Sequence, residues 1–119
     1  MSRRTDRVAS LIQVELGELV LRKLKDPRVS FVTVTHVDIS PDLKQARVFY
    51  SALGSSKQRI AAGRGLEHAA GFLQHEIAVA LKLRFTPKLT FHLDDSLDES
   101  LRIQQILHHL DQEKGKTNT

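Results

Sequence analysis

The spacing of the hydrophobic residues changes several times along this chain, and this change limits the folds that it can adopt. Over residues 5–25 the hydrophobic residues recur every three or four positions, which predicts one amphipathic helix. Residues 29–39 and 45–51 are instead rich in β-branched and aromatic side chains, which is typical of strands. Helical spacing returns between about 57 and 83, and polar and apolar residues alternate in a third strand over 88–93. This order predicts a small α+β domain in which helices cover a three-stranded sheet.

Turn and capping residues separate these segments. Asp26-Pro27 ends the first helix, because proline cannot continue the helical hydrogen bonds and restricts the residue before it. Residues 40–43 form a turn, and the short connection predicts an antiparallel hairpin between the first two strands. Ser55 and Gln58 have the spacing of a capping box at the start of the next helix. Pro87 ends the second helical stretch, and the order of the strands stays open.

Two irregularities predict local distortions. The alternation of the first strand changes phase between Val34 and Val37, which predicts a bulge near Thr35-His36. Gly71 lies inside the second helical stretch, where glycine costs about 1 kcal/mol relative to alanine. We therefore expect a kink or a close backbone approach at Gly71.

The end of the chain carries one more predicted element. A second capping-box pattern, Ser96 to Glu99, precedes apolar residues with helical spacing over 103–110, which predicts a short last helix. Residues 111–119 have nothing to bury, so we expect a disordered tail. At 119 residues the chain has the size of one domain, which we place at residues 1–110.

Composition excludes several classes of protein. The chain has no cysteine, so it has no disulfide, no thiol nucleophile and no cysteine-bound metal. No apolar run approaches the roughly 20 residues that cross a bilayer, and the basic start lacks the apolar stretch of a signal peptide. We expect a cytoplasmic protein without a membrane partner.

The sequence offers no positive evidence for an enzyme. His75-Glu76 begins like the zinc-protease motif, but Val79 occupies the position of the second histidine ligand. Phosphate-binding loops, dinucleotide fingerprints and the nucleophile elbow of hydrolases do not occur. We expect no catalytic residue, no metal and no cofactor.

The charge is unevenly distributed. Residues 1–92 carry 15 Lys or Arg against 8 Asp or Glu, a net charge of +7, whereas residues 93–119 carry a net charge of −3. Such asymmetry favours a polyanionic partner, with nucleic acid the first candidate and an anionic membrane surface the second. An ordinary solvated basic surface explains the charge equally well.

Basic residues gather at the ends of the predicted elements, where they could contact a phosphate backbone. Possible base-stacking rings are few: Phe31, Phe49, Tyr50 and Phe85. This composition favours a protein that reads phosphates and RNA shape over one that stacks on bases. The candidate RNA-binding residues are Arg3, Arg4, Arg7, Lys25, Arg28, Lys57, Arg59, Arg64, Lys82, Arg84 and Lys88.

Separated blocks of the sequence resemble the bacterial ribosome-binding factor A family over about residues 3–110. Their order and spacing match the elements predicted above. The blocks are Arg7-Val8-Ala9, Lys25-Asp26-Pro27-Arg28-Val29, Val32-Thr33-Val34-Thr35, Ser40-x-Asp42-Leu43-x-x-Ala46-x-Val48, Ala69-x-Gly71-Phe72-Leu73, Leu81-x-Leu83-Arg84-x-x-Pro87-x-Leu89-x-Phe91 and Asp95-Ser96.

The resemblance implies a fold and a function. The fold would be a single type II KH-like domain, in which an Ala-x-Gly kink at Ala69 and Gly71 replaces the usual Gly-x-x-Gly loop. The implied function is that of an assembly factor, not an enzyme, which binds free or immature 30S ribosomal subunits and assists maturation of 16S ribosomal RNA. We expect a monomer. The alternative is a KH-like RNA-binding module that acts outside ribosome assembly.

Overall fold

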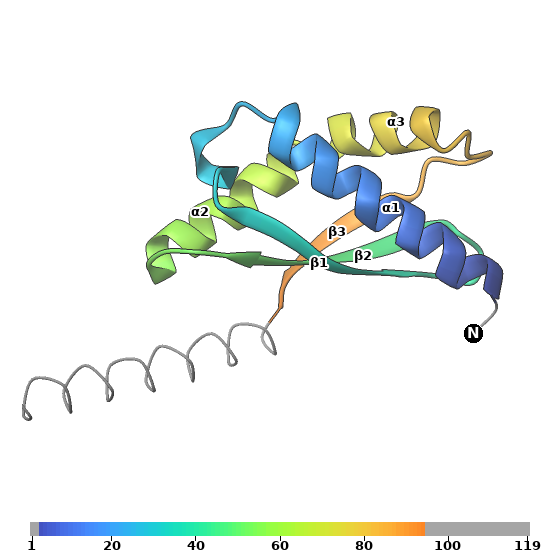
Figure 1. Cartoon of the computed structure of the whole chain (residues 1–119), viewed down its shortest axis with the longest axis horizontal. Helices are drawn as coiled ribbons and strands as arrows, with labels where there is room; N and C mark the ends of the chain where they lie inside the picture. The colour runs from blue at the N-terminus through green and yellow to red at the C-terminus, as the bar shows by residue number, and fades with distance from the viewer. Residues whose placement is uncertain (1–2, 95–119) are drawn as a thin grey trace, which may run out of the picture.

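The computed structural model describes residues 3–94, in which helices cover one face of a three-stranded sheet (Figure 1). The expected last helix and the expected tail, residues 111–119, lie outside the described residues. Within residues 3–94, no helix is both long enough and apolar enough to cross a membrane.

The sheet contains β1 (Val32–Ile39), β2 (Gln45–Ala52) and β3 (Lys88–Leu93), in the order β1-β2-β3. β1 and β2 pair antiparallel, which confirms the predicted hairpin. β3 pairs with β2 in parallel, so the sheet is mixed. A parallel neighbour needs a long crossover connection, and two helices between β2 and β3 supply it.

The predicted bulge in β1 is confirmed. Val34 pairs with Tyr50 and His36 pairs with Phe49, so Thr35 is an extra residue in β1. The extra residue turns Val37 toward the helices, where it is buried, and leaves His36 exposed. The phase change in the sequence therefore reflects a real change of the buried face.

The helices are α1 (Arg3–Arg22), the short 3-10 helix η1 (Pro27–Val29), α2 (Ser56–His68) and α3 (Ala70–Ala80). The capping box at the start of α2 is confirmed, because the side chains of Ser55 and Gln58 each accept a backbone N–H of the other residue. Ala69 separates α2 from α3, two residues before Gly71.

The second helical stretch ends at Ala80, earlier than its hydrophobic spacing predicts. Lys82 has a φ of 51°, in the left-handed region. The N–H groups of Lys82 and Leu83 donate to the carbonyl groups of Val79 and Ala78, at 3.3 and 3.0 Å. This is a Schellman motif with a lysine in the position that glycine usually takes. The motif, and not Pro87, therefore ends the helix.

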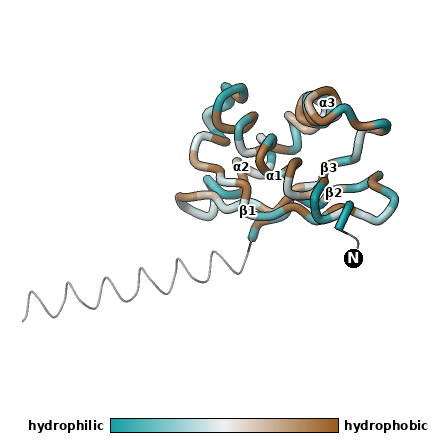
Figure 2. Tube along the Cα trace, turned by 45° about the vertical axis from the view of Figure 1, so that its right-hand side comes forward, coloured by the Kyte–Doolittle hydropathy of each residue, from teal (hydrophilic) through white to brown (hydrophobic). Residues whose placement is uncertain are grey.

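Two clusters of buried side chains hold the helices on the sheet. The larger joins α1 and α3 to all three strands and includes Ile12, Leu16 and Leu73. The smaller joins α2 and η1 to β2 and includes Leu66 and Val29. Figure 2 shows hydrophobic residues along α3.

A kink or a close backbone approach is expected at Gly71, and the structure shows an interruption of the helix at Ala69, two residues earlier, but no close approach. A Cβ atom at Gly71 would meet nothing within 4 Å. Close neighbours occur instead at Gly54, Gly63 and Gly65. At Gly65 in α2, a Cβ would lie 2.9 Å from Cγ1 of Val29 and 3.3 Å from Oδ2 of Asp26. Gly65 therefore allows α2 to pack tightly against η1.

Candidate nucleic-acid interface

The predicted cationic residues are accessible to a ligand. All of them are exposed except Arg59, which is half-buried. Long basic side chains at exposed positions keep their charged groups in water, where they can reach a phosphate.

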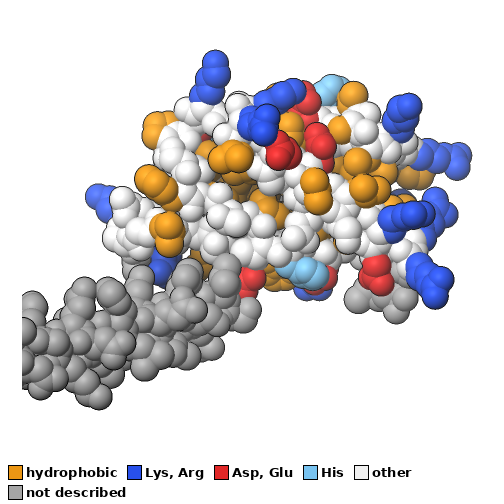
Figure 3. Space-filling view, viewed as in Figure 1, with side chains coloured by type: hydrophobic (Ala, Val, Ile, Leu, Met, Phe, Trp, Pro, Cys, Tyr) orange, Lys and Arg blue, Asp and Glu red, His pale blue; other side chains and the backbone are white. Residues whose placement is uncertain are grey.

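The structure divides these residues between two ends of the molecule. One end holds the start of α1 and the connection from α3 to β3, and the other holds η1 and α2 (Figure 1). The first end includes Arg3, Arg4, Arg7, Lys82, Arg84 and Lys88, and the second includes Lys25, Arg28, Lys57, Arg59 and Arg64. In Figure 3 Lys and Arg side chains gather at the right-hand end, which corresponds to the first group.

Lys44 also belongs to the first group, although it is not among the RNA-binding residues predicted from the sequence. The N–H of Lys88 donates to the carbonyl oxygen of Lys44 at 2.8 Å, so the start of β3 lies beside the β1–β2 turn. This neighbourhood exists because β3 is parallel to β2 at the edge of the sheet. We call Arg3, Arg4, Arg7, Lys44, Lys82, Arg84 and Lys88 the cationic end.

At the second end, an acidic neighbour compensates one of the candidate cations. Arg28 donates to both carboxylate oxygens of Asp26, and the shortest of these bonds, from Nη2 to Oδ2, is 2.6 Å. The hydrogen bonds from Arg28 hold the pKa of Asp26 below its ordinary value. Arg28 is therefore a poor candidate for a phosphate contact.

At the cationic end, the lysines and arginines make no ion pairs with acidic side chains of residues 3–94. Among residues 3–94, the ion pairs of the lysines and arginines involve Arg22, Lys23, Arg28 and Arg47, and none of these belongs to the cationic end. The Cζ atom of Arg84 lies 5.7 Å from the ring centroid of Phe85, a distance at which the cation interacts with the ring. The charges of the cationic end therefore remain available to an anionic ligand.

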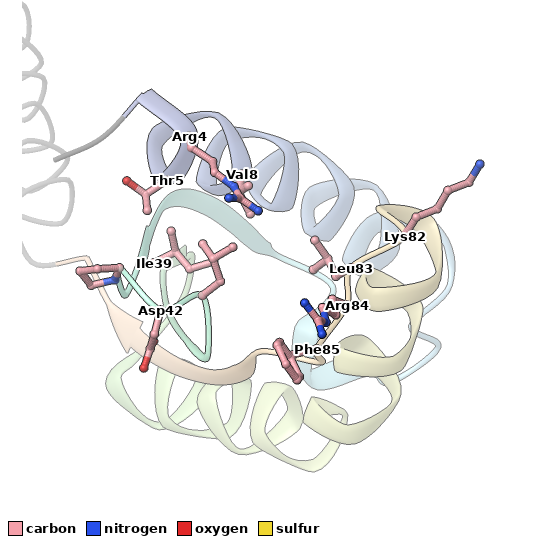
Figure 4. Close-up of a pocket in the computed structure, with 11 residues that line it drawn as sticks. Arg4, Thr5, Val8, Ile39, Asp42, Lys82, Leu83, Arg84 and Phe85 are labelled. Atoms are coloured by element: carbon pink, nitrogen blue, oxygen red, sulfur yellow. The ribbon is translucent and has the colours of Figure 1, made fainter.

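A cavity of about 640 Å³ opens within the cationic end, and we call it the Arg84 pocket. The start of α1, the β1–β2 turn and the α3–β3 connection each contribute residues to its lining. Figure 4 shows Arg4 and Arg84 extending toward the space between these segments, whereas Lys82 points away from it. Val8, Ile39, Leu43 and Leu83 supply apolar lining.

Two lining residues of the Arg84 pocket have an unusual backbone. Leu43 has a φ of 61° and Lys82 a φ of 51°, and they are the non-glycine residues with positive φ in the described part of the chain. The left-handed conformation costs a residue with a Cβ atom roughly 1–2 kcal/mol. Both loops that border the pocket are therefore held in conformations that local preference opposes.

Gln74 fixes the helix that precedes the pocket loop. Its side-chain oxygen Oε1 accepts a hydrogen bond of 3.0 Å from the backbone N–H of Leu89. The bond joins α3 to the edge strand β3 and so holds both ends of the connection that carries Arg84. The amide is part-buried, and nothing in the sequence pattern identifies this role.

The four candidate stacking rings differ in their exposure and in their neighbours. Tyr50 is buried, and burial raises the pKa of its phenol, so its selection as a stacking residue is wrong. Phe49 lies between His36 and His92 on the sheet, with ring centroids 6.0 and 5.5 Å apart. Phe31 and Phe85 are well exposed, and Phe85 lines the Arg84 pocket.

Metal-ligating side chains do not gather in the part of the chain that the structure describes. No group of three or more His, Asp or Glu residues there could hold a metal ion. The candidate interface therefore consists of cations, apolar lining and one exposed ring.

Comparisons with known proteins identify the family. The family described as ribosome-binding factor A matches this sequence over residues 4–107. The chain belongs to the ribosome-binding factor A family. A ribosome-binding factor A from Geobacter sulfurreducens is 38% identical over 115 residues, which cover 97% of this chain and 98% of that protein.

Solved structures of ribosome-binding factor A share the fold. The crystal structure of the Thermus thermophilus protein has a TM-score of 0.67 and 26% identity, and the match covers 75% of this chain and 94% of that one. A homology model of the Thermus thermophilus protein, fitted into a cryo-EM map of a 30S complex, has a TM-score of 0.57 and 24% identity, and the match covers 78% of this chain and 93% of that one. The second likeness concerns the fold alone.

Proposed function

We propose that this protein is a ribosome assembly factor that binds free or immature 30S subunits in the cytoplasm and assists maturation of 16S ribosomal RNA. Family membership carries the proposal, since the similarity to the Geobacter sulfurreducens protein extends over nearly the whole of both chains. The Thermus thermophilus protein of the same fold has been placed in a 30S complex. The protein acts as a monomer that binds RNA and catalyses no reaction.

The fold supports an RNA-binding role. The order α1-β1-β2-α2-α3-β3, with β3 parallel to β2, resembles a type II KH domain. In that comparison the junction between α2 and α3, at Ala69-Ala70-Gly71, replaces the Gly-x-x-Gly loop. A protein of this kind assists maturation by binding one RNA arrangement more tightly than another, because differential affinity is what shifts an equilibrium.

The cationic end is the surface that we assign to ribosomal RNA. Its cations are exposed and, within the described residues, make no ion pairs. Guanidinium groups bind phosphates through paired hydrogen bonds, and lysines add charge without a fixed geometry. The second end, where Arg28 is paired with Asp26, is the weaker candidate.

A pair of charge-reversal variants tests this assignment. Lys82→Glu with Arg84→Glu should weaken co-sedimentation with 30S particles by about tenfold or more, because repulsion replaces two phosphate contacts. Lys57→Glu with Arg64→Glu is the matched control, since both residues are exposed cations at the second end. Both variants should melt within a few degrees of the wild-type protein, because exposed substitutions change stability by about 0.5 kcal/mol.

The co-sedimentation results distinguish between the possible RNA-binding surfaces. Loss of 30S binding in the control variant alone would move the interface to α2 and η1. Normal binding by both variants would contradict an electrostatic interface at either tested site. Wild-type protein that sediments with messenger RNA and not with 30S particles would favour the alternative, a KH-like module outside ribosome assembly.

A further inference from the structure

We propose that the Arg84 pocket receives one unpaired nucleotide of single-stranded RNA, with its phosphate between Arg4 and Arg84 and its base against Phe85. The proposal rests on the proposed function, because it takes RNA to be the ligand. The proposed function requires only phosphate contacts at the cationic end. The further inference is that the protein also binds the base of an unstacked nucleotide there.

The charged part of the pocket suits a phosphate. Arg4 comes from α1 and Arg84 from the α3–β3 connection, and both side chains extend toward the same space (Figure 4). Within the described residues neither has an acidic partner in an ion pair. Asp42, the acidic residue of the lining, accepts hydrogen bonds at Oδ1 from the hydroxyl of Ser40 at 2.6 Å and the N–H of Lys44 at 3.1 Å, and these bonds lower its pKa, so it stays anionic. Its side chain extends away from Arg4 and Arg84 (Figure 4).

The remaining lining suits a base. Ile39, Leu43 and Leu83 provide apolar contact, and Phe85 adds an aromatic ring that is 57% exposed. Unstacked bases bind to aromatic rings, and the Phe85 ring lies beside Arg84, the residue that would hold the phosphate. The cavity volume of about 640 Å³ lies within the range of small-ligand sites.

Two hydrogen-bonded turns fix the loops that border the pocket. Leu43 and Lys82 have left-handed backbones, and both line the Arg84 pocket. Lys82 takes this conformation in the Schellman motif that ends α3, and the N–H of Leu43 donates to the carbonyl oxygen of Ser40 at 2.9 Å in the β1–β2 turn. These turns place the two loops on either side of the pocket.

A double-stranded RNA would use this end of the molecule differently. Its phosphates would contact the exposed cations from outside, and its paired bases could not reach Phe85, because they are stacked within the helix. The ring and the apolar lining therefore distinguish single-stranded from double-stranded RNA. This difference supplies the test.

The test compares Phe85→Ala with Phe31→Ala. Phe31 is the matched control, since it is an exposed phenylalanine at the second end, 68% exposed against 57% for Phe85. Fluorescence anisotropy measures the affinity of each protein for a labelled unstructured oligoribonucleotide of about ten nucleotides and for a blunt-ended, fully paired RNA duplex. Thermal melts followed by circular dichroism verify that the variants fold.

Phe85→Ala should weaken binding of the single strand by about 5- to 150-fold, the range expected for the loss of one stacked base. It should leave the duplex affinity and the salt dependence unchanged, and Phe85→Trp should restore single-strand binding. Phe31→Ala should bind both RNAs like the wild-type protein.

Several outcomes would overturn the proposal: wild-type protein that fails to bind the single strand, Phe85→Ala that binds it normally, or Phe31→Ala that loses it equally. If Phe85→Ala is normal while Lys82→Glu with Arg84→Glu loses 30S particles, the cationic end contacts phosphates only and the proposed function stands. If neither variant changes any binding, the assignment of the cationic end fails as well.

Discussion

At Lys82 the backbone conformation favours glycine, whereas the residue present is an exposed lysine. Its backbone is left-handed, at a φ of 51°, because the Schellman motif that ends α3 requires this conformation. Its side chain is exposed and points away from the Arg84 pocket, so packing does not compensate the strain. The exposed ammonium group of Lys82 adds to the positive charge of the cationic end.

Lys82→Gly should therefore raise the free energy of unfolding by about 1 kcal/mol, because glycine adopts the left-handed conformation without a Cβ clash. Urea denaturation measures the change. Lys57→Gly, in the first turn of α2, is the control and should lower stability, because glycine is a poor helix former. A loss of stability in Lys82→Gly would contradict the strain at this residue.

At the scale of elements, the contact between α2 and η1 depends on the absence of a side chain. Gly65 is buried in the last turn of α2, where alanine would be the better helix former. The closeness of Val29 and Asp26 explains why glycine is present. Gly71 has no such neighbour and is exposed at the start of α3.

The two glycines should respond in opposite directions to alanine. Gly65→Ala should lower the free energy of unfolding by about 1 kcal/mol or more, because the clash with Val29 exceeds the gain in helix propensity. Gly71→Ala should raise it by up to about 1 kcal/mol, since its Cβ would enter open space. Thermal and urea denaturation of both variants measure the difference, and a destabilised Gly71→Ala would show that this glycine is needed at the helix junction.

At the scale of the whole molecule, positive charge is concentrated at one end of the described part of the chain, where the lysines and arginines make no ion pairs within residues 3–94. The cationic end combines residues from α1, the β1–β2 turn, the α3–β3 connection and the start of β3. A positive field of this kind steers the approach of a polyanion before any specific contact forms.

Binding of 30S particles should therefore weaken steeply with salt. A fourfold increase in monovalent salt should lower the wild-type affinity by about tenfold or more, since several phosphate contacts release counterions. The slope of log affinity against log salt should shrink by about one for each cation that Lys82→Glu and Arg84→Glu remove. The variant at Lys57 and Arg64 should retain the wild-type slope. Affinity that does not depend on salt would rule out an electrostatic interface.

The sequence alone was sufficient for the elements whose signals are local. The hairpin of β1 and β2, the bulge at Thr35 and the capping box at Ser55 were each predicted and are each present. Alternation, turn chemistry and capping depend on residues a few positions apart, so a single segment contains the whole signal. The exposure of Lys82 and Arg84 was predictable for the same reason, because both lie where a helix gives way to a strand.

Only the tertiary structure decided which of these residues meet. The parallel placement of β3 beside β2 brings Lys88 to Lys44, and the packing of α1 on the sheet brings Arg4 to the same end. The need for glycine at Gly65 and the left-handed backbone of Lys82 likewise became visible in the folded chain alone. Contacts between segments depend on strand direction and on the packing of helices, and these follow from the free energy of the whole fold, which no single segment contains.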